Sequence, residues 1–150
     1  MTCTGTYLGH LKESDIVEVA ADGRALEPGK TPTSEKALHL GAYARRPDVC
    51  AVVHAHSPFT VAYFHYFPRI ELLSFESELY LGEVPVIDQF TITVTDVGPV
   101  LDAFTGHDIV VLRRHGVVAV GKDFREAFSL IELLEEQCRV QLTVKAPHIG

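Results

Sequence analysis

Residues 49–58, VCAVVHAHSP, constrain the fold of this chain more strongly than any other stretch. The apolar, β-branched run that opens the stretch predicts a short buried strand. Because strand side chains alternate between faces, His54 and His56 point the same way. Ser57-Pro58 ends the strand, which places both imidazoles at its carboxyl end, where open α/β folds carry their chemistry. The pair suits one divalent metal ion, and the alternative is a pair of packing residues in the core.

A third imidazole follows a second apolar strand. Residues 109–112 run directly into Arg-Arg-His-Gly, which places His115 at a carboxyl end in the same way. We expect the two strands to lie side by side and to bring His115 to His54 and His56. A zinc site needs at least three protein ligands, and imidazole suits zinc better than magnesium. The three histidines therefore predict a zinc site with one open coordination position.

Length and composition fit one globular domain over residues 1–150, since 47% of the residues are hydrophobic. The net charge of −7, with no basic run, argues against nucleic acid as the main partner. No apolar segment approaches a membrane span, and no signal peptide begins at Met1. Cys3, Cys50 and Cys138 are odd in number, far apart and without a CxxC pattern, so we expect reduced thiols in a cytoplasmic protein.

A helix is expected from about residue 34 to residue 46. Thr33 or Ser34 can cap it, and Glu35 lies in its first turn, where the helix dipole favours a carboxylate. Glu35 is a structural residue on that interpretation. On the other interpretation the start of the helix binds a phosphate, and Glu35 faces the metal as an acid/base group. His39 lies one turn further on the same helix face and is expected to pack beside the site.

The other patterns predict further elements of an α/β fold. Residues 15–20 alternate like a strand and precede an Asp-Gly turn. Residues 70–81 fit either a strand or a short helix. The remaining expected elements are a helix at 58–67, a strand at 84–87, a loop or edge strand at 91–97, a short helix at 98–104 and a strand at 117–120.

A long helix is expected near the end of the sequence, after a capping-box pattern of Asp123 and Glu126. Its apolar stripe, expected to pack on the core, comprises Phe124, Ala127, Phe128, Ile131, Leu134 and Cys138. The face expected to be solvated carries Glu132, Glu135 and Glu136.

Two longer segments, PTSEKALHLGAYARRPDVCAVVHAHSP and LRRHGVVAVGKDFREAFSLIELLEE, carry a family resemblance. The sequence resembles the class II aldolase/adducin family, which includes L-fuculose-phosphate aldolase and L-ribulose-phosphate 4-epimerase. The resemblance extends from Thr4-Gly5 to the last helix. It implies an α/β fold, a three-layer α/β/α sandwich with a central mixed, mostly antiparallel sheet. It also implies a homotetramer with active sites at the subunit interfaces.

Carried over to this sequence, the resemblance implies that His54, His56 and His115 ligate zinc. Glu35 corresponds to the acid/base glutamate of the aldolases, whereas the epimerases have aspartate there, so carbon–carbon cleavage is favoured. The implied reaction is a metal-assisted retro-aldol cleavage of a small, L-fuculose-1-phosphate-like sugar phosphate. Its products would be dihydroxyacetone phosphate and an aldehyde, with Glu35 moving the proton.

The resemblance also implies a site for the substrate phosphate. Thr33 and Ser34 match the serine pair that binds this phosphate in the family. Thr4 and Gly5 match the Thr-Gly loop on the other side of the phosphate. A small phosphorylated sugar is therefore the expected partner.

The sequence departs from the family pattern in two places. Members usually begin with a helix, a Gly/Asn-rich segment and a strand before the Thr-Gly turn. This sequence begins at that turn, so we expect an N-terminally short domain. In the aldolases a neighbouring subunit supplies a tyrosine as proton donor. That position aligns near Phe75, and the nearby Tyr80 is the possible replacement.

Other functions use the same metal ligands. They include a 4-epimerase, a sugar-acid phosphate decarboxylase and a thioribulose-phosphate dehydratase. A function of a different class is a non-catalytic interaction module like the adducin head. Those heads lose the metal histidines, whereas this chain retains all three.

Overall fold

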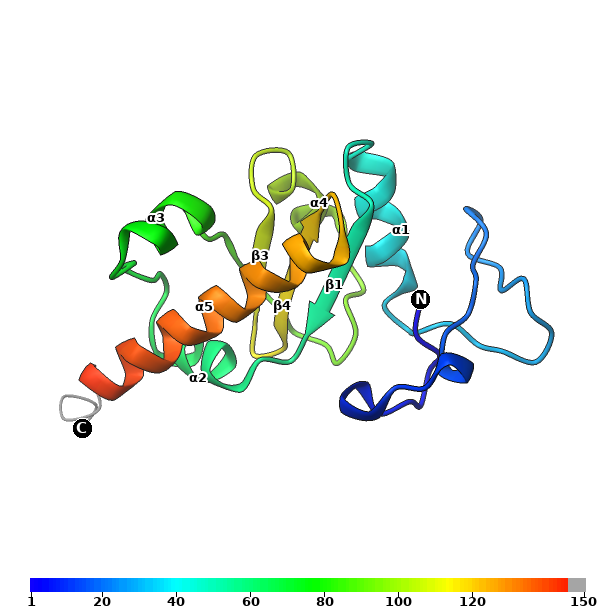
Figure 1. Cartoon of the computed structure of the whole chain (residues 1–150), viewed down its shortest axis with the longest axis horizontal. Coiled ribbons are helices and arrows are strands. Elements are labelled where there is room, and N and C mark those ends of the chain that lie inside the picture. The colour runs from blue at the N-terminus through cyan, green and yellow to red at the C-terminus, as the bar shows by residue number, and fades with distance from the viewer. Residues whose placement is uncertain (146–150) are drawn as a thin grey trace.

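A four-stranded sheet forms the centre of the computed structural model, which describes residues 1–145 (Figure 1). Its strands are β1 (Ala51–Ala55), β2 (Val86–Asp88), β3 (Ile109–Arg113) and β4 (Gly116–Gly121). They lie in the order β1-β4-β3-β2. β4 pairs antiparallel with β1 and with β3, and β2 pairs parallel with β3. The sheet is thus mixed and mostly antiparallel, as the resemblance implied.

Helices cover both faces of this sheet (Figure 1). Within residues 1–145 they are α1 (Lys36–Arg45), α2 (Pro58–Tyr66), α3 (Phe75–Leu81), α4 (Gly98–Ala103) and α5 (Phe124–Lys145). α2 and α3 pack against α5 on one face, whereas α1 and α4 pack together on the other. The three-layer α/β/α arrangement is confirmed. The ambiguous segment 70–81 contains a helix in its second half.

β4 joins the two halves of the core because all six of its residues are buried. Val117 and Ala119 belong to the hydrophobic cluster beneath α5. Val118 and Val120 belong to the cluster beneath α1 and α4. This alternation follows from the two-residue period of a strand that is covered on both faces. It also fixes the face of the sheet toward which each side chain at the end of β4 points.

The first 35 residues contain short turns and single bridges rather than the strand expected at 15–20. Two 3₁₀ turns, Leu8–His10 and Glu13–Asp15, lie in this segment. Isolated bridges join Thr2 to Ile16 and Val19 to Ala25. The alternation at 15–20 was misleading because these residues form single bridges to separate segments. No continuous ladder of strand hydrogen bonds therefore forms.

The prediction that the apolar stripe of α5 packs on the core is only partly correct. Ala127, Ile131, Leu134 and Cys138 are buried as expected. Phe124 and Phe128 instead keep 64% and 39% of their surface exposed, and their rings stack on each other. They occupy the first turns of α5, next to the edge strand β1, where no further strand of the described chain covers them.

Glu135 is not a solvated residue, contrary to expectation. Its carboxylate accepts hydrogen bonds from the backbone N–H groups of Phe59 and Thr60, at 2.9 and 2.8 Å, and from the Thr60 hydroxyl at 2.8 Å. These N–H groups belong to the first turn of α2, which has no other intrahelical acceptor for them. A side chain of α5 therefore caps α2.

The cysteines are free thiols, with Cys138 buried, Cys50 exposed and Cys3 between the two. None of the helices described in residues 1–145 has the length and apolar character needed to cross a membrane.

Candidate metal centre

Three imidazoles meet at one edge of the sheet. The His54 ring centroid lies 4.9 Å from that of His56 and 4.9 Å from that of His115, and the last two are 5.1 Å apart. One ligand atom from each ring lies within 4.8 Å of the others. The predicted convergence of the three side chains is therefore present in the fold, and the cluster can hold a metal ion.

The route by which His115 reaches the other two differs from the expected one. β1 and β3 are not neighbours, because β4 lies between them. Since both run antiparallel to β4, they run parallel to each other and end at the same edge. The tight turn from β3 into β4 then carries His115 toward β1, where Ala55 pairs with Val117.

Hydrogen bonding leaves imidazole nitrogens free for a metal. Nδ1 of His54 donates to the Val117 carbonyl at 3.0 Å, which leaves Nε2 as the acceptor nitrogen. The Nε2 atom of His54 and the Nδ1 atom of His115 are both buried without a hydrogen-bond partner among the described residues. Buried polar atoms are rarely left unsatisfied, and metal-binding histidines commonly use their second nitrogen in this way. The donor set fits a zinc-like divalent ion.

His54 and His115, which are both half-buried, are in the protonation state that a metal requires. Burial lowers the pKa of His54 to about 3, with the neighbouring His115 and His56 acting in the same direction. Burial and the nearby His56 also lower the pKa of His115. At neutral pH these imidazoles are uncharged and keep a lone pair for a ligand bond.

Gly116 allows the turn to approach β1. A Cβ atom at this position would lie 2.3 Å from the Ala55 carbonyl oxygen and 3.1 Å from Cδ2 of His56. Both distances are shorter than ordinary van der Waals contacts, and the nearer atom is backbone. The glycine is therefore needed for close approach between the two segments that carry the histidines.

Glu35 lies beside the three imidazoles, and its carboxylate does not cap α1. The side chain is 6% exposed, and no capping hydrogen bond joins it to the helix. Its oxygens accept from the Val94 backbone N–H at 3.1 and 3.3 Å. A cavity of about 970 Å³ is lined by Glu35 together with His54, His56 and His115. The carboxylate can thus reach a molecule held at the histidines.

Of the other predicted site residues, some line the cavity at the histidines and others do not. Thr33 and Ser34 line the same cavity as the histidines. Thr4 and Gly5 are exposed and outside that lining, although the Thr4 N–H donates to the carbonyl of residue 31, two positions before Thr33. Tyr80 is 61% exposed on α3 and lines neither of the cavities at the histidines.

His39, one helical turn after Glu35, also lines this cavity but lies outside the cluster of three possible ligands. Burial lowers its pKa to about 4, so it is uncharged at neutral pH. Its place agrees with the expected packing role.

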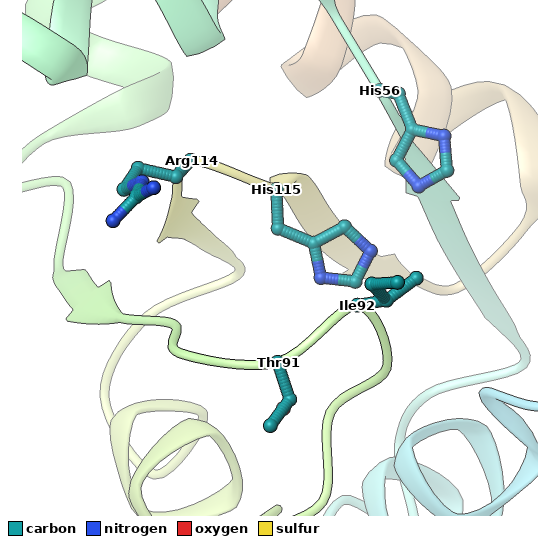
Figure 2. Close-up of a pocket in the computed structure, with 5 residues that line it drawn as sticks. All are labelled: His56, Thr91, Ile92, Arg114 and His115. Carbon is teal, nitrogen blue, oxygen red and sulfur yellow. The ribbon is translucent and has the colours of Figure 1, made fainter.

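A second, smaller cavity shares His56 and His115 with the first and was not anticipated from the sequence. It measures about 280 Å³ and is lined by His56, Thr91, Ile92, Arg114 and His115 (Figure 2). The only signal in the sequence was an arginine directly before a candidate metal ligand. The contribution of the loop after β2 could not be anticipated from that signal.

Comparison with known proteins agrees with this geometry. The chain is 38% identical to the L-fuculose phosphate aldolase of Methanocaldococcus jannaschii, over 95% of this chain and 77% of that protein. It is 29% identical to the methylthioribulose-1-phosphate dehydratase of Pseudomonas savastanoi pv. phaseolicola, over 97% and 78%. The structure of L-fuculose-1-phosphate aldolase from Thermus thermophilus superposes with a TM-score of 0.84 and 30% identity, over 99% of this chain and 79% of that one. The model of the class II aldolase and adducin N-terminal domain matches residues 1–142, and the chain belongs to this family.

Proposed function

We propose that this protein is a zinc-dependent aldolase that cleaves a small phosphorylated ketose into dihydroxyacetone phosphate and an aldehyde. The observation that supports this most strongly is the placement of the buried Glu35 carboxylate in the cavity of the three histidines. An acid/base group beside a metal site is what a retro-aldol cleavage requires. L-Fuculose 1-phosphate is the first substrate to test, because the similar proteins carry that name.

His54, His56 and His115 would hold the metal ion through their unpaired nitrogens. Zinc is proposed because three neutral imidazoles with an open position suit it, although other divalent transition metals accept the same donors. When bound, the ion supplies Lewis-acid polarisation of the substrate oxygens.

Glu35 would carry the proton. Its carboxylate, oriented by the Val94 N–H, would donate a proton to the carbon atom left on the three-carbon product after the bond breaks. Thr33 and Ser34 would bind the substrate phosphate with hydroxyl and backbone N–H groups at the start of α1. Thr4 and Gly5 would complete the phosphate site only if the segment that carries them closes further over it.

Tyr80 would act as proton donor only from another copy of the chain, because it lies on an exposed face of α3 outside both cavities. This part of the proposal therefore requires an oligomer, and we propose the homotetramer implied by the family resemblance.

A second candidate is a dehydratase acting on a phosphorylated thiosugar. It is favoured by similarity to proteins named methylthioribulose-1-phosphate dehydratase. The same metal ligands and acid/base group would serve loss of water in place of carbon–carbon cleavage. Product analysis separates the two, since only the aldolase releases dihydroxyacetone phosphate.

The test uses zinc-loaded protein with L-fuculose 1-phosphate and a panel of ketose phosphates, with dihydroxyacetone phosphate as the product measured. Glu35→Gln should lower kcat by about 10²- to 10⁴-fold, the usual contribution of a positioned acid/base group, with zinc content unchanged. His54→Ala should weaken zinc binding by more than about 100-fold, since even outer-shell changes cost 10- to 100-fold. Glu132→Gln, on the exposed side of α5, is the control. Full zinc occupancy without dihydroxyacetone phosphate from any substrate would refute the aldolase.

A further inference from the structure

Arg114 has an unusual backbone conformation. It is the one non-glycine residue among 1–145 with a positive φ, at 67°. L-amino acids other than asparagine and aspartate rarely adopt this left-handed region, and a turn that requires it usually carries glycine. Residues held in such conformations cluster at ligand-binding sites. The position therefore directs attention to what the arginine side chain contacts.

The guanidinium of Arg114 is free for a ligand. Within the described residues, no hydrogen bond or ion pair joins it to another group, and its side chain lines the smaller cavity with His56 and His115 (Figure 2). The adjacent Arg113 is engaged by contrast. It pairs with Asp88 at 2.7 Å and donates to the Phe64 carbonyl at 3.0 Å.

The lining of the smaller cavity lacks a carboxylate that could compete for this charge. Its other members are two histidines, Thr91 and Ile92. The Thr91 hydroxyl is already engaged with the Thr93 carbonyl at 2.6 Å. Arg114 is therefore the permanent positive charge of this cavity, in a protein whose net charge is −7.

The two cavities meet at the histidines. His56 and His115 line both of them, while Thr33 and Ser34 line only the larger one and Arg114 only the smaller one. In Figure 2, Arg114 lies on the side of His115 opposite His56. A substrate with its phosphate at the start of α1 and its reacting carbons at the histidines would extend its other end toward Arg114.

We propose that Arg114 binds a carboxylate at the end of the substrate remote from the phosphate, so that the preferred aldehyde product is a short aldehyde acid. This inference rests on the proposed function. A guanidinium presents two parallel N–H donors that match the two oxygens of a carboxylate. The smaller cavity, at about 280 Å³, is just below the range of about 300–1,000 Å³ typical of whole-ligand pockets, so it suits a fragment of two or three carbons.

The reaction balances without an oxidant or reductant. In cleavage, the substrate hydroxyl next to the breaking bond loses its proton and becomes the aldehyde of the acid. The electron pair of the broken bond stays on the three-carbon product, which takes up one proton. In the reverse direction, dihydroxyacetone phosphate adds to glyoxylate to give a five-carbon keto-acid phosphate.

The test measures binding before turnover. Zinc-loaded wild type, Arg114→Gly, Arg114→Lys and Arg69→Gly are titrated with glycolate, with its neutral analogue glycolamide and with inorganic phosphate. Arg69 is an exposed loop arginine outside both cavities, so it controls for loss of charge. Arg114→Gly should fold, because glycine is the residue that this φ favours.

Arg114→Gly should weaken glycolate binding by about 10-fold or more, in line with a charge-assisted hydrogen-bond pair. Glycolamide binding should not change, and Arg114→Lys should recover part of the loss. With dihydroxyacetone phosphate as donor, kcat/KM for glyoxylate should fall by a similar factor while kcat/KM for glycolaldehyde stays constant.

Equal glycolate affinities in wild type and Arg114→Gly would overturn the assignment. So would a loss confined to inorganic phosphate, because Arg114 would then belong to the phosphate site. The glycolate and phosphate affinities are measured without turnover. An absence of dihydroxyacetone phosphate from every substrate would refute the aldolase, whether or not the glycolate preference is found.

Discussion

Gly116 decides how closely the two histidine-bearing segments approach each other. The carbonyl of Ala55, at the end of β1, leaves no space for a side chain at this position. His56 follows Ala55, and His115 precedes the glycine. A single methyl group would therefore separate the proposed ligands of the two segments, at the point where they would share one ion.

Gly116→Ala should lower zinc affinity by about 10-fold or more, comparable to damage to a ligand's supporting shell. It should also destabilise the protein by about 1–3 kcal/mol, the cost of overpacking. Isothermal titration with zinc and urea unfolding measure the two effects. Gly106→Ala is the matched control, because nothing lies within 4 Å of a Cβ there. Wild-type zinc affinity in Gly116→Ala would contradict the steric argument.

Sequence reasoning at the residue scale predicted the cluster of three histidines and missed its surroundings. His54 and His56 were predictable because a two-residue spacing in a strand fixes a common direction. His115 was predictable because strand ends gather at one edge. The hydrogen bond from Val94 to Glu35 was not predictable, since 59 residues separate the two and the loop that carries Val94 has no regular period.

At the element scale, α2 depends on a side chain from another helix. Glu135 of α5 accepts from two backbone N–H groups and one hydroxyl in the first turn of α2. Ser57, the residue before α2, makes no side-chain capping hydrogen bond. α2 therefore obtains its N-terminal cap from α5, which couples the two helices that cover this face of the sheet.

Glu135→Ala should destabilise the protein by about 1–3 kcal/mol, because it removes a helix cap and leaves the donors of the buried Thr60 without this acceptor. Glu135→Gln should cost less, since its carbonyl can still accept. Urea unfolding of metal-free protein measures both. Glu132→Ala, three residues earlier on the exposed face, should lie within about 0.5 kcal/mol of wild type. Equal effects of the two alanine variants would refute the capping role.

Helices and strands with a strong period of apolar residues were predictable from the sequence. Segments whose structure depends on bridge partners far away in the sequence were not. The helix at 58–67 and the strand at 109–112 agree with α2 and β3 within one residue at each end. The strand expected at 15–20 failed because its bridge partners lie in separate segments. Phe128 was assigned to the core because a helical stripe shows which face is apolar, but not how far the sheet beneath it extends.

At the scale of the whole molecule, the large cavity draws its walls from parts of the chain that are far apart in sequence. They include the first 16 residues, the start and first turns of α1, strand β1, the loop at 92–93 and the start of α5. His39 lies within this boundary, and burial lowers its pKa to about 4. An imidazole kept neutral in this way links stability of the entire fold to pH.

The sign of this link follows from the two pKa values of His39. The unfolded chain has a histidine pKa near its ordinary 6.5, and the folded pKa is about 4. Between these values the unfolded state binds more protons, so stability rises with pH. The stabilisation is fully present above pH 6.5 and is lost as pH falls toward 4.

Metal-free protein should therefore lose stability between pH 7 and pH 5, and His39→Gln should lose about 2 kcal/mol less than wild type over that interval. Urea unfolding in the presence of a chelator, at both pH values, measures the difference. His65→Gln removes an exposed histidine that lines neither cavity, so it is the control and should follow wild type. If His39→Gln and His65→Gln lost stability in parallel with wild type, the His39 imidazole would not be the group that couples folding to pH. Part of the remaining pH dependence in His39→Gln should come from His54 and His115, whose pKa values are also lowered by burial.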